Sequence, residues 1–158
     1  MKQYDRILVC IDLSPNSLPP LKEALAIRDE STELTGLHVV PESGPEAESF
    51  QRFYQIEGSE ESLLRNYALP WLENWLKKVE VTLPRSMELE ARVGEPAEEI
   101  IEFAEQQGTD LIVMGTHGRQ GIKRYWMGSV AEAVVRRASC PVMTVRAQNP
   151  QPGVIEQD

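Results

Sequence analysis

The sequence predicts a single α/β domain built on an open, doubly wound parallel sheet of five strands. Five short apolar runs, rich in Val, Ile, Leu and Met, alternate along the chain with segments whose apolar residues recur at helical spacing. The runs are Ile7–Ile11, Leu34–Val40, Met87–Val93, Leu111–Met114 and Val142–Val145. Because they are continuous instead of alternating, we expect helices to cover both faces of the sheet.

Four helices are expected between the strands. Their apolar stripes are Leu18, Leu21, Ala24 and Leu25; Leu72, Trp75, Leu76 and Val79; Ala97, Ile100, Ile101 and Ala104; and Val130, Ala133, Val134 and Ala138. Residues 41–59 hold Pro, Gly, Ser and acids with little periodicity, so we expect a mobile excursion there before the second helix. Pro70 should then kink or split the segment that follows. The side chains of Trp71 and Trp75 are expected to pack against other side chains of the protein.

Turn residues agree with this order of elements. Gly94 and Pro96 mark a strand-to-helix turn, with Pro96 at a plausible first helical position. Gly108 is expected to close that helix, and Asp110 precedes the next strand. We expect one domain over residues 1–146 and a disordered tail over residues 147–158.

Composition and charge narrow the function classes. The chain has 158 residues and a net charge of −9, so it repels a phosphate backbone on average and nucleic acid is a poor partner. Residues 115–146 nevertheless carry six bases and one acid, which suits a small anion; alternatively, Arg136 and Arg137 only end a helix. No apolar run is long enough to insert into a membrane and no signal peptide is evident, so we expect a cytoplasmic protein. Cys10 and Cys140 are expected to be reduced, buried thiols.

Ligands of open parallel sheets bind beyond the carboxyl ends of the strands. The first run leads to Asp12, and the fourth leads to a glycine-rich stretch that begins at Gly115 and continues to Gly128 and Ser129. Glycines let backbone N–H groups approach a phosphate, and a helix N-terminus adds unpaired donors. The stretch contains neither the GxxxxGK[ST] loop nor the GxGxxG fingerprint. These absences argue against a P-loop NTPase and a nicotinamide dehydrogenase.

The spacing is Gly-x2-Gly-x9-Gly-Ser, formed by Gly115, Gly118, Gly128 and Ser129. It resembles the nucleotide-binding signature of the universal stress protein family. Further stretches in the family's order are Ile7–Val9 leading to Asp12, Leu37–Val40, Gly94–Pro96, Asp110–Gly115 and Ser139–Val142. The resemblance therefore covers residues from about 5 to 146.

The resemblance implies a Rossmann-like sheet of order 3-2-1-4-5, related to the adenine nucleotide alpha hydrolases, and a homodimer paired along the last strand, Val142 to Val145. It also implies ATP over the ends of the first and fourth strands, with Mg²⁺ held through the phosphates. Asp12 and Val39 would hold the adenine. The other implied nucleotide-binding residues are Ile11, Met114, Gly115, His117, Gly118, Gly128, Ser129 and Val130. From its charge and place, we add Arg119 as a cation for the γ-phosphate.

Structural interpretations stand beside these roles. Asp12 could terminate its strand and cap the following helix with Ser14 or Ser17. Ser129 and Glu132 read as a capping box, although Ser129 could also meet a phosphate. His117 has no orienting partner in the sequence that would make it catalytic, and His38 reads as a satisfied core residue.

The leading hypothesis is an ATP-binding regulatory stress protein with an unknown protein partner. Binding would order residues 115–128 and change the surface around Tyr125 and Trp126, where the family usually has small aliphatic residues. Two alternatives remain open: a member that binds proteins without nucleotide, and an enzyme. We expect hydrolysis to be slow at most, because no supported general base is evident.

Overall fold

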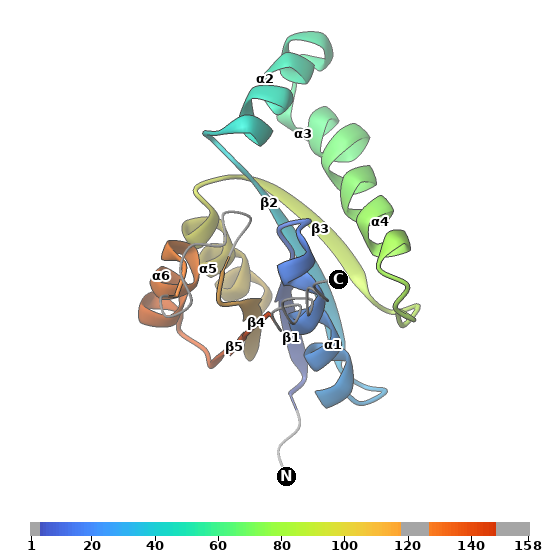
Figure 1. The fold of residues 1–158 in the computed structure, drawn as a ribbon, viewed down its shortest axis with the longest axis vertical. Helices are drawn as coiled ribbons and strands as arrows, with labels where there is room; N and C mark the ends of the chain where they lie inside the picture. The colour runs from blue at the N-terminus through green and yellow to red at the C-terminus, as the bar shows by residue number, and fades with distance from the viewer. Residues whose placement is uncertain (1–3, 118–126, 148–158) are drawn as a thin grey trace, which may run out of the picture.

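The computed structural model describes residues 4–117 and 127–147. Its parallel sheet has the order β3-β2-β1-β4-β5, which confirms the predicted fold class and strand order (Figure 1). The strands are β1 (Arg6–Cys10), β2 (Glu33–Pro41), β3 (Glu88–Gly94), β4 (Leu111–Gly115) and β5 (Val142–Val145). Each begins and ends within one residue of the corresponding apolar run.

Helices cover both faces of the sheet. The helices α5 (Pro96–Gln107) and α6 (Ser129–Arg137) bury one face, in a cluster that includes Leu8 and Ile112. The helices α1 (Leu18–Ile27) and α4 (Leu69–Lys78) bury the other, around Ile7 and Val113. Neighbouring residues of one strand thus face opposite layers, and both layers are apolar. This is why the strands read as continuous apolar runs.

Residues 41–59, expected from their low periodicity to be an excursion before the second helix, contain a helix that the sequence analysis did not predict. After Pro41, helix α2 (Pro45–Glu57) forms, and α3 (Glu60–Leu63) follows it. Ala47 and Phe50, one helical turn apart, are both buried, and Phe50 packs in a cluster with Val40 and Ala91. Glu42 and Glu48 are exposed, and polar residues such as these obscured a short apolar stripe in the sequence. The two helices extend from one end of the sheet (Figure 1).

Pro70 does interrupt its helical segment, as predicted. Residues Leu64–Ala68 form a π-helical turn between α3 and α4, and the Leu69 N–H reaches back five residues to the Leu64 carbonyl. Pro70 lies in the first turn of α4 and has no N–H to donate. Its ring would also clash with the carbonyl four residues earlier, so the widened turn before it accommodates the proline.

The turns around α5 form as the sequence predicts. Pro96 lies in the first turn, and the Glu95 carboxylate caps the helix by accepting from the Glu98 N–H. Gly108 ends the helix in the left-handed conformation, with φ of 63°, and donates to the Ala104 and Glu105 carbonyls. A residue with a side chain would be strained at this φ, so glycine is favoured there.

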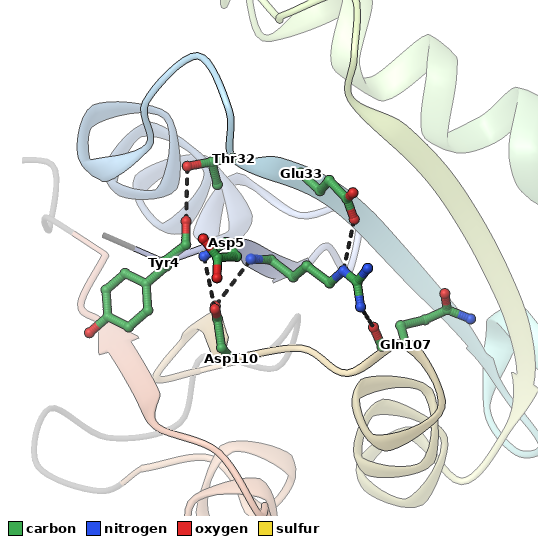
Figure 2. Close-up of polar contacts among 7 residues, drawn as sticks. Tyr4, Asp5, Thr32, Glu33, Gln107 and Asp110 are labelled. Carbon is green, nitrogen blue, oxygen red and sulfur yellow. Dashed lines mark hydrogen bonds and ion pairs between the residues drawn. The ribbon is translucent and has the colours of Figure 1, made fainter. Parts of the chain in front are cut away.

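Polar contacts close the amino edge of the sheet (Figure 2). The Asp110 carboxylate accepts from the backbone N–H groups of Asp5 and Arg6, at 2.8 and 3.2 Å. The Arg6 guanidinium donates to Glu33 at 2.9 Å and to the Gln107 carbonyl at 3.1 Å. A polar hollow of about 230 Å³ lies beside Arg6 and Glu33. These contacts hold the strand ends together, so the polar groups at this edge are explained by their structural role.

In the part of the chain that the structure describes, no helix is long and apolar enough to cross a membrane. The expected tail lies outside the described residues from residue 148 onward.

Candidate functional site

The candidate site lies at the carboxyl ends of β1, β2 and β4. Val9 of β1 is paired with Val113 of β4, so the chain leaves both strands at the same level. On the other side, Cys10 is paired with Leu37 of β2, and the Ile11 N–H donates to the Leu37 carbonyl at 2.8 Å. The parallel register therefore places the segments after β1 and β4 next to each other.

Asp12 organises the loop that follows β1. One of its carboxylate oxygens, Oδ1, accepts from the Ser14 N–H at 2.9 Å, the Ser14 hydroxyl at 2.7 Å and the Ser17 hydroxyl at 2.6 Å. The Ser17 oxygen accepts in turn from the Asp12 N–H, at 2.9 Å. Both serines are buried. The network also holds Leu13 in the left-handed region, with φ of 62°, an uncommon conformation for such a residue.

The structural interpretation of Asp12 is therefore correct in outline. Ser14 is the N-cap of a short 3-10 helix, Pro15–Ser17, and accepts from the Asn16 N–H at 3.2 Å. Asp12 fixes this cap through the Ser14 hydroxyl. A contact between Asp12 and adenine stays a prediction.

Gly115 ends β4 directly against this loop. A Cβ atom at position 115 would lie 3.0 Å from the Asn16 carbonyl oxygen and 3.4 Å from that of His117. The obstacle is backbone on both sides, so a larger residue could fit only if a loop moved. The glycine thus allows the two loops of the site to approach each other closely.

Thr116 joins three segments that are far apart in the sequence. Its carbonyl accepts from the Gly128 N–H at 2.6 Å, and its own N–H donates to the Val145 carbonyl at 3.2 Å. The first contact brings the start of α6 to the end of β4, and the second sets the end of β5. Sequence reasoning did not select Thr116, because it has no local pattern that would reveal these partners.

Helix α6 begins differently from its prediction. Gly128 is the N-cap, with Ser129 as the first helical residue, so Ser129 and Glu132 do not form a capping box. Glu132 instead pairs with Arg136 one turn later, at 2.8 Å. Glycine has no side chain that could accept from the first N–H groups of α6. No other side chain among the described residues caps them. An N-terminus of this kind suits an anion.

His117 follows Thr116 and is half-buried. Its Nδ1 lies 2.9 Å from the Thr116 hydroxyl oxygen, while Nε2 is buried and has no hydrogen-bond partner within the described residues. A buried ring nitrogen without a partner costs free energy, which a bound ligand could recover. The prediction that His38 is a satisfied core residue is confirmed, because it is buried and its Nδ1 lies 2.8 Å from the Ile11 carbonyl.

The expected adenine side is apolar. Ile11 and Met114 are buried, and Val39 is half-buried against the cluster beneath α5 and α6. Cys10 lies in the same layer, and burial raises the pKa of its thiol to about 12. Cys10 and Cys140 are both free thiols, as predicted, but both are half-buried, whereas the prediction was that they are buried.

Several of the predicted residues meet at the carboxyl edge: Ile11, Asp12, Val39, Met114, Gly115, His117, Gly128, Ser129 and Val130 are placed on the ends of β1, β2 and β4 or on the first turn of α6. Gly118, Arg119, Tyr125 and Trp126 lie outside the described residues. No cluster of His, Cys, Asp or Glu in the described ranges could hold a metal ion.

The close glycine junction, the uncapped start of α6 and the buried Nε2 of His117 fit a phosphorylated ligand at this edge. Phosphate oxygens accept hydrogen bonds, and each of these features either supplies a donor or gives room for close approach. A divalent ion would then be bound mainly by the ligand's own phosphates.

Comparison with known proteins agrees with the fold. The chain is 36% identical to universal stress protein MJ0531 of Methanocaldococcus jannaschii, over 90% of this chain and 82% of that protein. The solved structure of MJ0577 from the same organism has a TM-score of 0.71 at 30% identity, covering 94% of this chain and 99% of that one. A universal stress protein solved in complex with cAMP shares the fold, with a TM-score of 0.58 at 24% identity and coverage of 92% and 98%.

The model of the universal stress protein family matches residues 3–146, which include every strand of the sheet and both loops of the site. The chain therefore belongs to the universal stress protein family.

Proposed function

We propose that this protein binds ATP at the carboxyl ends of β1 and β4 and that the nucleotide regulates its contacts with a protein partner. The observation that carries the proposal is the 2.6 Å hydrogen bond from the Gly128 N–H to the Thr116 carbonyl. It brings the start of α6, whose N-cap residue has no side chain, beside Gly115, which itself lies against the Asp12 loop.

Support also comes from the spacing of Gly115, Gly118, Gly128 and Ser129, which resembles the family's nucleotide-binding signature. One protein of this fold is solved in complex with cAMP, so an adenine nucleotide is compatible with the architecture. Asp12 and Val39 would contact the adenine, and Gly115, His117 and the first turn of α6 would contact the ribose and phosphates. Mg²⁺, held through the phosphates, would neutralise part of their charge.

The proposal includes a homodimer paired along β5. Within the described residues this strand pairs with β4 on one side only, and all four of its residues remain partly exposed. An apolar edge strand of this kind is suited to pairing with a second copy. The location in the cytoplasm remains a prediction.

The test begins with protein purified without added nucleotide. Denaturation and mass spectrometry would identify any released ligand, and calorimetry with Mg-ATP would measure binding. ATP or ADP near one per chain, or micromolar binding, supports the proposal. The variant Gly115→Val should abolish binding because its side chain meets the Asn16 carbonyl, whereas Ser31→Ala, an exposed change outside the site, should bind normally.

Absence of ligand and of binding in the wild type would contradict the proposal and favour a family member that acts through proteins alone. Turnover above a few per minute (our estimate of slow against the roughly 1–100 per second of kinases) would instead indicate an enzyme. To test the regulatory part, hydrogen exchange should be compared with and without saturating Mg-ATP. Unchanged exchange over residues 115–128 would refute an ordering switch there.

A further inference from the structure

Two neighbouring residues at the end of β4 form a unit with one unused hydrogen-bonding position. The Thr116 hydroxyl oxygen lies 2.9 Å from Nδ1 of His117, and Thr116 itself is buried. On the far side of the ring, Nε2 is buried without a partner among residues 4–117 and 127–147. A neutral imidazole carries its proton on one nitrogen, so the Thr116 contact can decide what Nε2 offers.

The chain's other histidine shows the opposite arrangement. Nδ1 of His38 lies 2.8 Å from the Ile11 carbonyl oxygen, which can only accept, so neutral His38 carries its proton on Nδ1. The hydroxyl of Thr116 can donate as well as accept. If it donates to Nδ1 of His117, the proton lies on Nε2, and Nε2–H becomes a buried donor.

We propose that Thr116 is a positioning residue of the ligand site: its hydroxyl donates to Nδ1 of His117 and holds the Nε2–H tautomer, which donates to a phosphate oxygen of the ligand. This inference rests on the proposed nucleotide function. The choice of tautomer follows from the ligand's chemistry, since an ionised phosphate oxygen accepts hydrogen bonds and would be repelled by an unprotonated ring nitrogen.

The backbone of Thr116 supports the same role. Its carbonyl holds Gly128 at 2.6 Å, and Gly128 begins α6. The residue that orients the ring therefore also sets the position of the helix N-terminus, whose N–H groups attract anions. One residue thus aligns two sets of donors for the same ligand group.

Three variants separate these effects. Thr116→Val removes the hydroxyl while keeping the branched shape and the backbone contacts, Thr116→Ser keeps the hydroxyl, and His117→Phe removes the donor. By calorimetry with Mg-ATP, Thr116→Val and His117→Phe should each weaken binding about tenfold, which corresponds to ~1.4 kcal/mol. Thr116→Ser should bind like the wild type. The double variant that combines Thr116→Val with His117→Phe should bind no more weakly than His117→Phe alone, because Thr116 acts through the His117 ring.

Long-range ¹H–¹⁵N spectra of the imidazoles, recorded at mildly basic pH, give a readout that a merely structural role would not move. In the wild type His117 should show the Nε2–H tautomer and His38 the Nδ1–H tautomer. Thr116→Val should mix the tautomers of His117 and leave His38 unchanged. Ligand-observed NMR with adenosine, which has no phosphate, should show equal binding to the wild type and to Thr116→Val.

A wild-type His117 in the Nδ1–H form overturns the inference, as does full ATP affinity in Thr116→Val. Equal weakening for adenosine would place the acceptor on the nucleoside and overturn the phosphate assignment. If Thr116→Val fails to fold, the tautomer of the wild type and the affinities of Thr116→Ser and His117→Phe still decide the question. A wild type that shows the expected tautomer but binds no Mg-ATP refutes the proposed function instead. The hydrogen bond from Nε2–H to a phosphate oxygen is then refuted as well.

Discussion

Removal of the Ser14 hydroxyl should destabilise the protein much more than removal of the same group in a second, similar turn. In the site, Ser14 donates to Asp12 at 2.7 Å, accepts from the Asn16 N–H at 3.2 Å and is buried. On the surface, Ser31 donates to Asp29 at the same 2.7 Å but is exposed. The two serines thus share a hydrogen bond and differ in burial.

The magnitude follows from what each change leaves behind. In Ser14→Ala the half-buried Asp12 carboxylate loses a charge-assisted hydrogen bond, about 1.5–3 kcal/mol, and the 3-10 helix loses its cap, about 0.5–2 kcal/mol. Because the two losses share one hydroxyl and are not additive, we expect about 2–3 kcal/mol in all. In Ser31→Ala water replaces the lost hydroxyl, so the variant should stay close to the wild type.

Urea denaturation monitored by circular dichroism measures both variants against the wild type. For a chain of this length, the loss in Ser14→Ala corresponds to a Tm lower by about 4–12 °C. The slope of the unfolding free energy against urea should not change, because the surface exposed on unfolding is the same. Equal effects of Ser14→Ala and Ser31→Ala would refute the reasoning that burial gives the Asp12 network its weight.

Three further changes test other parts of the fold. Gly115→Ala should cost about 1–3 kcal/mol in urea denaturation, since its Cβ meets the Asn16 carbonyl at 3.0 Å, and a neutral result would show that the loop yields freely. Burial raises the pKa of the Cys10 thiol to about 12, so the thiol ionises more readily in the unfolded chain, and stability should fall as the pH rises above about 9. Cys10→Ala should weaken this decline, and an unchanged decline would contradict the reasoning. Burial, together with the nearby Glu102 carboxylate, raises the pKa of Glu99, so its charged form destabilises the fold at neutral pH. Glu99→Gln should therefore raise the Tm at neutral pH and lose that advantage in acid. A lower Tm at neutral pH would show that the attraction of Glu99 to Arg92 outweighs burial.

Local patterns were sufficient for the strands and most helices. Apolar runs such as Leu111–Met114 predict buried strands because a strand between two helical layers must be apolar on both faces. Pro70 and Gly108 act through their own covalent geometry, so their effects can be read without neighbours. Helix α2 was missed because its apolar stripe is short: of its described side chains, Ala47 and Phe50 are buried, and polar residues stand between and beside them.

The sequence by itself determined the sheet and the glycine spacing, and it predicted the edge at which a ligand would bind. Only the tertiary structure decided how that edge is assembled: Gly128, not Ser129, is the N-cap residue of α6, and Thr116 links Gly128 to β5 and to His117. The reason is physical. Hydrophobic period and backbone geometry depend on nearby residues, whereas a hydrogen bond between Thr116 and Val145 exists only after parallel strands fix the register of distant segments.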